Sequence, residues 1–566
     1  MTAARQERRA EAQRVREEVP ATEPDAAPEV APAGWGRRLL ARLELQRPDV
    51  VALLVLTAVA FVFRFFSPLM PDVLSHPFQG APISNCVQNT PVDTANHAGT
   101  LCGLAYPFQR NYAQAGQPPT PPQGQIFDEV YFPVFAHDDL KGISYFDPEP
   151  PLSKLFIASG EWLYGWWRAT FEGAHGNYAD LGFNTFGWRI MACLFGTLCV
   201  PMMYLLAHRL WPNRVFALAA GVLTCFDGMF FVQSRIGMID IFPIFLILLS
   251  YWVFLIHLGS RTERESLVTL VLTGIVLGLA ISSKWIALAA WASVIFFLVM
   301  RPIRRRLAVG IGEWRWGRGE GPALPGGARI APFVAVAVVA LVLVPVAIYL
   351  ASWIPFFTRG QFHDLKDLIL YQKQSYDYHA HLTATHPYGS PWFSWPFLFR
   401  PVAYYYEYQG LGSDAFSGQS LVAGIVNLGN PWIWWTSLPC LLALPYFIFR
   451  HRSFPAAVIA VGFITQFLPW SRVTRVIFLY HMFGGLIFMI LALAFTLGRI
   501  STSEGLVFEA GAFRLALSGR QIAYAHLAVA IGFFLWFYPV WTGLPITSHA
   551  YLSPFPDGKM WFPSWI

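Results

Sequence analysis

Long apolar windows recur along this chain, and they constrain its fold more than any other feature. They run from residue 50 to residue 544, and each is close to the ~20 residues that an α-helix needs to cross a bilayer. Such segments must be helical, because lipid offers the backbone no hydrogen-bond partner. The chain is 55% hydrophobic and only 13% charged, which excludes an ordinary soluble domain. The sequence therefore predicts an all-α polytopic membrane protein.

About eleven transmembrane helices are expected from the apolar windows. Their predicted limits are 50–68, 188–208, 215–233, 240–258, 266–283, 285–300, 332–352, 432–449, 455–470, 474–497 and 522–544. An odd number of crossings places the two termini on opposite sides of the membrane. Two long polar segments separate the helices, at 69–187 and 353–431.

The distribution of arginine indicates the orientation of the chain. If residues 1–49 are cytoplasmic, the short loops on that side are rich in Arg, as the positive-inside rule requires. The segments 69–187 and 353–431 are much poorer in Arg and Lys for their length. We therefore expect these two loops and the C-terminal tail, 546–566, to be extracytoplasmic. The net charge of +6 then reflects topology and gives no reason to expect a nucleic-acid partner.

The first 49 residues differ in composition from the rest of the chain. They are rich in Ala, Glu, Arg and Pro and carry charges of both signs, so we expect a disordered cytoplasmic region. They lack the short apolar core of a cleaved signal peptide, so the span at 50–68 is expected to remain as an anchor. The following segment, 50–545, is expected to form one transmembrane domain.

Two of the six cysteines, Cys86 and Cys102, lie in the first extracytoplasmic loop. This compartment permits disulfides. A bridge would close a loop of about 15 residues and stabilise it by roughly 3 kcal/mol. We expect this disulfide, with two free thiols as the alternative. The other cysteines fall in predicted spans, where a thiol is usually a small apolar filler.

Charged residues gather at the predicted extracytoplasmic face. An acidic pair, Asp128-Glu129, follows the first span, and on its own it would be read as a solvated turn. The other charges at this level lie at span ends, at Arg64, Arg189, Arg235, Asp240, Lys284, Arg472 and Arg475. Charges near hydrocarbon are costly, so each of these residues needs an explanation. They are either side chains at helix ends that reach water, or ion pairs such as Arg235 with Asp240. Alternatively, they form one functional rim, which is a shared set of charges at the outer face. We favour the rim, because Arg and Lys together suit a phosphate group.

The ordered series of motifs resembles the protein O-mannosyltransferases, membrane enzymes of the GT-C glycosyltransferase superfamily. The matching stretches are Phe127-Asp-Glu-Val-Tyr-Phe132, Pro150-Pro-Leu-Ser-Lys154, Arg189, Arg235-Ile-Gly-Met-Ile-Asp240, Ser282-Ser-Lys-Trp285 and His386-Pro-Tyr-Gly-Ser-Pro-Trp392. The resemblance implies a GT-C catalytic domain over 50–545 in the cell membrane. It also implies transfer of mannose from polyprenyl phosphate mannose to Ser or Thr hydroxyls of secreted polypeptides. The bilayer would be a partner, and the secretion machinery is a further candidate.

The resemblance also implies roles for individual residues. The acidic pair of the family maps onto Asp128-Glu129, with Asp128 as the base and Glu129 positioning acceptor or sugar hydroxyls. The phosphate of the donor departs as an anion, so a single inverting displacement needs one base and cations for the phosphate. A glycosidase would instead need two carboxyls with separate roles. The expected phosphate ligands are Arg189, Arg235, Lys284 and Arg472. This mechanism requires no cofactor, and it leaves a requirement for a divalent metal as an open alternative.

The chain departs from the family pattern at three places. Glu149 stands where the family usually has His, so we expect this carboxylate either to position the acceptor or the sugar, as we expect of Asp240, or to be a rival base. The acidic pair lies farther from the first span than expected. The loop 353–431 is too short for the β-trefoil domain of eukaryotic members, which suggests a bacterial form. The chain has 34 Arg but only 6 Lys, and this preference for Arg is typical of a GC-rich genome such as that of an actinobacterium.

The second extracytoplasmic loop leaves alternatives open. Its histidines have no recognised ligand spacing, so we expect polar loop residues rather than a metal site. They are His363, His379, His381 and His386. Its many aromatic residues either anchor the loop in the membrane interface or contact donor and acceptor. Two other functions compete, namely a GT-C transferase that acts on a cell-wall glycan or lipid, and a transporter. Charges at one face and the lack of repeated halves disfavour a transporter.

Overall fold

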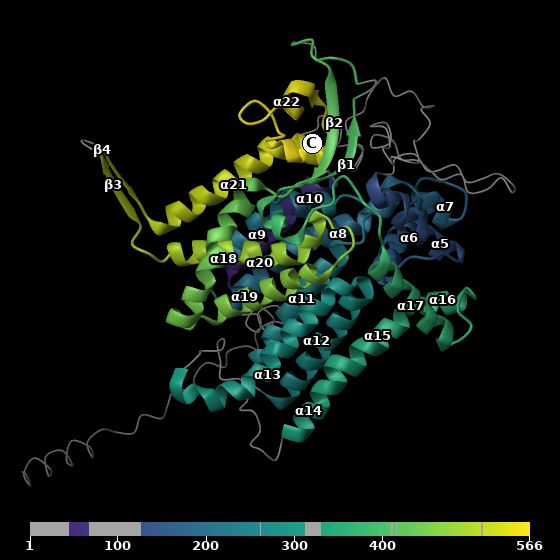
Figure 1. Ribbon diagram of the computed structural model, residues 1–566, viewed down its shortest axis with the longest axis horizontal. Coiled ribbons are helices and arrows are strands. Elements are labelled where there is room, and N and C mark those ends of the chain that lie inside the picture. Colours follow the sequence, from purple (N-terminus) through teal and green to yellow (C-terminus); the bar gives the residue numbers. More distant parts are fainter. Residues whose placement is uncertain are drawn as a thin grey trace, which may run out of the picture. The chain divides into compact units, whose positions relative to one another are not determined.

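The computed structural model of the chain is largely helical (Figure 1). It describes residues 45–66, 126–260, 262–311, 330–408, 411–414, 416–510 and 513–566. Almost all of the predicted N-terminal region, 1–49, lies outside the described residues. The predicted disulfide between Cys86 and Cys102 lies outside them as well. The chain divides into two units, 1–52 and 53–566, and the contacts below are all within the second.

Within the described ranges, nine helical segments are long and apolar enough to cross a membrane. They are Arg47–Phe65, Thr185–Leu210, Ile241–Leu258, Glu263–Ser283, Phe333–Thr358, Pro431–His451, Phe454–Arg472, Leu479–Ile500 and Gly519–Thr542. Shorter apolar helices, Arg214–Cys225 and Trp285–Met300, lie where two further spans were predicted. The prediction of a polytopic membrane protein is confirmed, whereas the number of eleven spans is not.

The predicted span 215–233 is not one continuous helix. Helix α9 (Arg214–Cys225) ends before Asp227, and α10 (Gly228–Gln233) begins after it. Asp227 caps α10 by accepting a hydrogen bond from the amide of Phe230 at 3.0 Å. It also accepts one from the indole of Trp434 at 2.8 Å. The prediction was wrong here because a buried carboxylate with these donors ends one helix and starts the next.

The helices pack in two neighbouring groups. One surrounds α20 (Phe483–Ile500), whose residues are all buried from Phe483 to Phe495, and includes α9, α18 (Pro431–His451) and α19 (Phe454–Phe467). In the other, α11 (Ile241–Leu258) packs against α8 (Thr185–Leu210) and α12 (Glu263–Ser283). The other helical elements of the apolar segments are α3 (Arg47–Phe65), α13 (Leu288–Ile311), α14 (Ile330–Val338), the π-helical turn η4 (Val339–Leu343), α15 (Val344–Ser352) and α21 (Gly519–Thr542).

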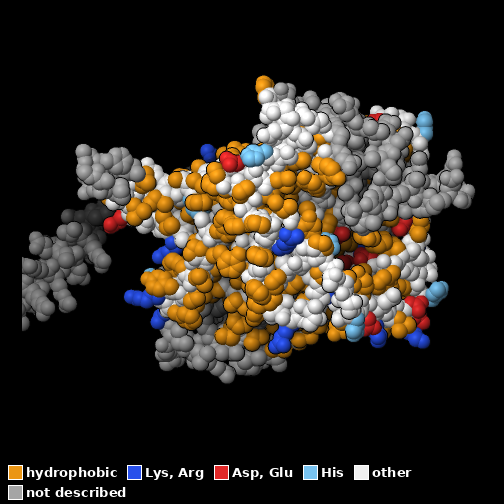
Figure 2. Space-filling model, turned by 45° about the horizontal axis from the view of Figure 1, so that its top comes forward, with side chains coloured by type: hydrophobic (Ala, Val, Ile, Leu, Met, Phe, Trp, Pro, Cys, Tyr) orange, Lys and Arg blue, Asp and Glu red, His pale blue; other side chains and the backbone are white. Residues whose placement is uncertain are grey.

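Apolar side chains cover much of the molecular surface. Figure 2 shows hydrophobic side chains over most of the visible helical face, with charged side chains mainly near its margins. Large apolar residues are strongly exposed on α18, where Leu442 is 82% and Phe449 is 81% exposed. Exposure on this scale is unusual for a soluble protein and suits helices that face lipid.

Both predicted extracytoplasmic loops contain regular structure. The first, 69–187, includes α5 (Phe132–Lys141), α6 (Leu152–Phe171) and α7 (Tyr178–Gly182). The second, 353–431, includes α16 (Ile354–Thr358), α17 (Leu365–His381), the short 3-10 helix η5 (Trp392–Phe397), β1 (Val402–Glu407) and β2 (Leu421–Asn427). The all-α prediction contained no strands, but β1 and β2 are antiparallel, and β5 (Ile546–Thr547) extends their sheet. A second hairpin joins β3 (Leu506–Ala510) to β4 (Phe513–Leu517).

The C-terminal segment, 546–566, folds against the second loop. It contains β5, α22 (Ser548–Leu552) and the short 3-10 helix η8 (Pro563–Trp565). The indole of Trp565 is buried and donates to the carbonyl of Leu398 at 2.7 Å. Arg400 donates to the carbonyl of Ser564 at 2.7 Å. This segment is therefore part of the folded domain and not an extended tail.

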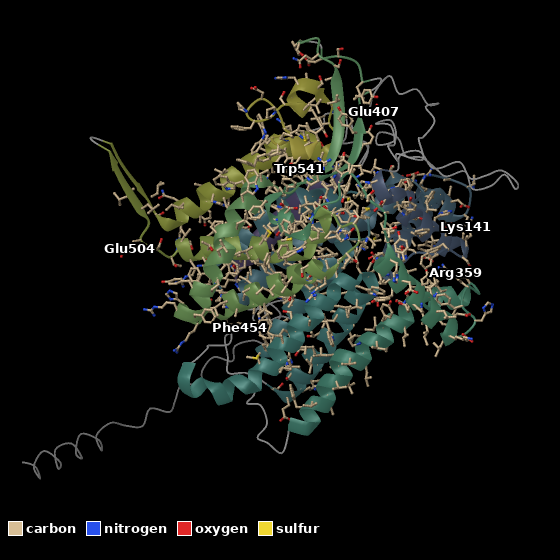
Figure 3. All side chains as sticks on the ribbon, in the orientation of Figure 1. Lys141, Arg359, Glu407, Phe454, Glu504 and Trp541 are labelled. Atoms are coloured by element: carbon tan, nitrogen blue, oxygen red, sulfur yellow. The ribbon has the colours of Figure 1, made fainter. Side chains whose placement is uncertain are left out.

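Ion pairs hold α5 in place. Figure 3 labels Lys141, at the end of α5, and Arg359, which follows α16. Arg359 forms a buried ion pair with Asp139 of α5. Lys141 pairs with Asp180 of α7 at 2.8 Å. Because α5 directly follows the acidic pair in the sequence, these contacts fix the segment on which that pair lies.

Candidate active site

The two residues of the acidic pair have different surroundings, although they are neighbours in the 3-10 helix η1 (Phe127–Val130). Glu129 is fully buried and accepts hydrogen bonds from Arg189 Nε at 2.6 Å and Nη2 at 2.5 Å. It also accepts from the backbone amides of Gly237 at 2.6 Å and Ile126 at 3.0 Å. These contacts make Glu129 an anchor for η1, and they do not favour its predicted contact with acceptor or sugar.

Arg189 shares this buried position. Its side chain is only 2% exposed and is engaged by Glu129 in a two-point ion pair. Its place in α8 is set by Asn184, whose side chain caps the helix by accepting from the amides of Phe186 and Gly187. A guanidinium committed to a buried carboxylate is a poor ligand for an incoming phosphate. The geometry therefore does not favour the predicted phosphate role of Arg189.

Asp128 is partly exposed and lies among other charges. Burial raises the pKa of its carboxyl to about 7, and the nearby carboxylate of Asp240 adds to this effect. Lys284 acts in the opposite direction, and Asp147 makes a smaller contribution that also raises the pKa. A carboxyl group with this pKa is partly ionised at neutral pH, which suits a general base.

The backbone before Asp128 is strained. Phe127 has φ of 49°, in the left-handed region that aromatic residues rarely adopt. Its ring stacks on that of Tyr404 in β1, with the centroids 4.1 Å apart. The Tyr404 hydroxyl in turn accepts from Gln233 at 2.9 Å and from Asn427 at 2.7 Å. Strain of this kind persists only where the surrounding structure enforces it, and here the packing fixes the direction of Asp128.

Asp240 and Lys284 form a second ion pair in the site, in addition to the pair between Glu129 and Arg189. Lys284 Nζ lies 2.7 Å from Asp240 Oδ1 and 3.9 Å from Glu149 Oε1. Asp240 therefore pairs with Lys284. Burial alone would lower the pKa of Lys284, but Asp240 and Glu149 outweigh it and raise the pKa. Lys284 thus remains a cation beside the carboxylate of Asp128.

Lys154 shapes the loop that carries Glu149. It is almost fully buried, forms an ion pair with Asp147 and donates to the carbonyl of Glu149 at 2.8 Å. The Tyr371 hydroxyl fixes the same loop through the backbone of Asp147. Burial tends to raise the pKa of Glu149, but the cations around it, led by Lys284, hold the pKa below its ordinary value. Glu149 is therefore presented as an ionised carboxylate.

Ser153 joins this loop to the segments that carry the other charges. Its Oγ lies 3.1 Å from the carbonyl oxygens of both Ile239 and Ser283. Those two residues immediately precede Asp240 and Lys284. One buried hydroxyl thus holds three separate segments together at the site.

A cavity of about 780 Å³ lies beside these residues. Its polar wall contains the cations Lys284, Arg472 and Arg475 together with Glu149, while Leu288, Ala289 and Ala292 form part of an apolar wall. This volume is in the range of small-molecule sites. A wall with three cations and an apolar wall together match a ligand with an anionic head and a hydrocarbon tail.

The structure thus brings together only some of the predicted site residues. Asp128, Asp240, Glu149 and Lys284 are neighbours, and Arg472 lines the cavity. Arg235 is not among the residues that line it, and its guanidinium carbon lies 5.0 Å from the ring centroid of Phe231.

Several residues of the site were given no individual role in the sequence-based prediction. They are Arg475, Lys154, Tyr404, His379 and His481. Arg475 had a usable signal, since it lies in the same short segment as Arg472. His379 and His481 line the cavity, whereas His363 lies outside it, paired with Asp367. No group of three or more His, Cys, Asp or Glu side chains that could hold a metal ion occurs among the described residues.

Two family models match the chain. Residues 120–358 match the model described as dolichyl-phosphate-mannose-protein mannosyltransferase. Residues 364–565 match the C-terminal four-transmembrane region of protein-O-mannosyltransferase. Among curated relatives, the polyprenol-phosphate-mannose–protein mannosyltransferase of Mycobacterium tuberculosis is 26% identical over 78% of this chain and 86% of its own length. The enzyme of the same name from Corynebacterium glutamicum is 26% identical over 78% and 88%.

The fold also matches a solved structure. The protein O-mannosyltransferase Pmt1-Pmt2 complex of S. cerevisiae, bound to the sugar donor, has a TM-score of 0.64 over 94% of both chains, at 14% identity. This likeness shows a common GT-C fold. Both family models describe one family and together account for well over half of the sequence. The chain therefore belongs to the protein O-mannosyltransferases, a family of membrane glycosyltransferases.

Proposed function

We propose that this protein transfers mannose from polyprenyl phosphate mannose to Ser or Thr hydroxyls of secreted polypeptides, with inversion at the anomeric carbon. The observation that carries the proposal is the position of Asp128 beside the Asp240–Lys284 pair, whose Lys284 lines a cavity with three cations and an apolar wall. The names of the mycobacterial and corynebacterial relatives support the choice of donor.

In the proposed reaction, the acceptor hydroxyl oxygen attacks the anomeric carbon of mannose. The Asp128 carboxylate takes the hydroxyl proton as the new carbon–oxygen bond forms. The bond from the anomeric carbon to the phosphate oxygen breaks, and its electron pair leaves with the phosphate. The products are the mannosylated polypeptide and polyprenyl phosphate, and Asp128 afterwards releases its proton to water.

The cations of the cavity complete the mechanism. Lys284, Arg472 and Arg475 would bind the phosphate and stabilise the negative charge that grows on it during transfer. Asp240 fixes Lys284 through its Oδ1, while its buried Oδ2 has no hydrogen-bond partner among the described residues. That oxygen, together with Glu149, is placed to accept hydrogen bonds from sugar or acceptor hydroxyls.

We further propose that the site faces the outside of the cell membrane. The Arg-rich short loops support a cytoplasmic N-terminus, which places both long loops and the C-terminus outside. Lys284 follows the C-terminal end of α12, and Arg472 and Arg475 follow the C-terminal end of α19. All three cations line the same cavity as Glu149, so they belong to the same side of the membrane as that carboxylate. Lipid-linked donors and secreted acceptors would meet at this level.

Transfer by the detergent-purified protein tests the proposal. We expect one hexose to be added to a Ser/Thr-rich peptide from synthetic polyprenyl phosphate β-mannose, detected by mass spectrometry. The linkage, determined by nuclear magnetic resonance, should be α. A β-linked product would overturn the single displacement, and consumption of donor with a glycan or lipid acceptor alone would replace the proposed acceptor.

The pH dependence of transfer should follow Asp128. Since its pKa is about 7 and only the carboxylate can take a proton, kcat/KM should rise with pH and reach half of its plateau near pH 7. Below that point it should fall about tenfold per pH unit. The measurement is kcat/KM in a series of buffers at constant ionic strength. A profile that stays flat down to about pH 5 would contradict Asp128 as a base with a raised pKa.

A further inference from the structure

Gln466 is a polar residue in an apolar membrane helix, and the mechanism above does not use it. It lies near the C-terminal end of α19 and is only 2% exposed. Neither Oε1 nor Nε2 of its amide has a hydrogen-bond partner among the described residues. A buried amide without partners is destabilising, and polar side chains within membrane spans are commonly functional.

The amide of Gln466 has a definite place in the site. Gln466 lines the same cavity as Lys284, Arg472 and Arg475. The space beside it is kept free by Gly484 of α20, because a Cβ atom at that position would collide with Gln466 Oε1. The protein thus holds an amide without a partner among the described residues at the wall of a cavity that carries three cations.

We propose that Gln466 binds the phosphate group of the lipid-linked sugar donor by donating a hydrogen bond from its amide nitrogen to a phosphate oxygen. The inference rests on the proposed function. A hydrocarbon tail offers no hydrogen-bond acceptor, so the tail cannot satisfy the amide. The sugar must reach Asp128, which is not among the residues that line the cavity. The phosphate is therefore the part of the donor that lies among the three cations and within reach of Gln466.

The test compares Gln466→Met with the wild type as full-length protein in detergent. Methionine has nearly the same length and no hydrogen-bonding amide. We expect binding of polyprenyl phosphate, measured directly by native mass spectrometry, to weaken about tenfold, the size expected for a hydrogen bond to a charged group. The donor KM should rise by a similar factor with little change in kcat. The melting temperature should not fall, because a buried group without partners has been removed.

Thr197→Val is the matched control. Thr197 of α8 is 3% exposed, has a hydroxyl without a partner among the described residues, and is not among those that line the cavity. Its replacement should leave both polyprenyl phosphate binding and donor KM unchanged. A second variant, Gln466→Glu, keeps the shape but adds negative charge, so it should weaken binding more than Gln466→Met does.

Three results would overturn the inference. These are unchanged binding and KM in Gln466→Met, a raised donor KM with unchanged polyprenyl phosphate binding, and a wild-type protein that does not bind polyprenyl phosphate. The second result would move the contact from the phosphate to the sugar. If the wild type binds polyprenyl phosphate and Gln466→Met weakens it, the inference stands even where no mannose is transferred. In that case the missing transfer contradicts only the proposed function, and the role of Gln466 in phosphate binding still stands.

Discussion

Replacing Asp128 by Asn is expected to lower kcat for mannose transfer by about 10²–10⁴-fold, the range observed for loss of a general base. Asparagine has nearly the same shape but cannot take the proton of the acceptor hydroxyl. The donor KM should change little, because Asp128 is not among the residues that line the cavity with the three cations. The fold should be retained, since the neighbouring carboxylates Asp240 and Asp147 lose a like charge beside them.

The measurement is transfer from polyprenyl phosphate mannose to a peptide under single-turnover conditions, with melting temperature as the check on folding. Asp557→Asn is the control, because that carboxylate is exposed in the C-terminal segment. Glu149→Gln tests the rival base and Asp240→Asn tests the residue that fixes Lys284, and each variant should retain more activity than Asp128→Asn. If Asp128→Asn stays active while Glu149→Gln is inactive, the base has been assigned to the wrong residue.

Breaking the Glu129–Arg189 pair should destabilise the fold by about 3 kcal/mol, near the lower end of the range for loss of one partner of a buried ion pair. In Glu129→Gln, the carboxylate that accepts two hydrogen bonds from Arg189 is replaced by an amide with one acceptor oxygen. The same change weakens the contact with the amide of Gly237. Because Asp128 is the preceding residue, activity should fall with stability.

The free energy of unfolding in detergent is the appropriate measurement, with Arg189→Met and the double variant alongside Glu129→Gln. We expect the double variant to lose less stability than the sum of the single variants, since each single change already removes the pair. Strict additivity would contradict a coupled pair. A normal stability with a strongly raised donor KM in Arg189→Met would instead support a role in phosphate binding.

The positions of the membrane helices were largely predictable, because hydropathy is a local property and lipid demands that each span satisfy its own backbone. The break at Asp227 was not, since its partner Trp434 is distant in the sequence. The strands β1 and β2 were also missed. They occur in an aromatic-rich polar loop where neither membrane burial nor a regular alternation predicted pairing.

Three properties of this protein could be read from local sequence patterns, namely that it spans the membrane many times, that its charges collect at the ends of spans, and which family it resembles. Only the tertiary structure separated the roles of two adjacent acids. Glu129 pairs with Arg189, 60 residues away, and with the amide of Gly237, 108 residues away, while Asp128 remains beside Asp240 and Lys284. Those contacts join segments that are far apart in the sequence, so local patterns do not contain them.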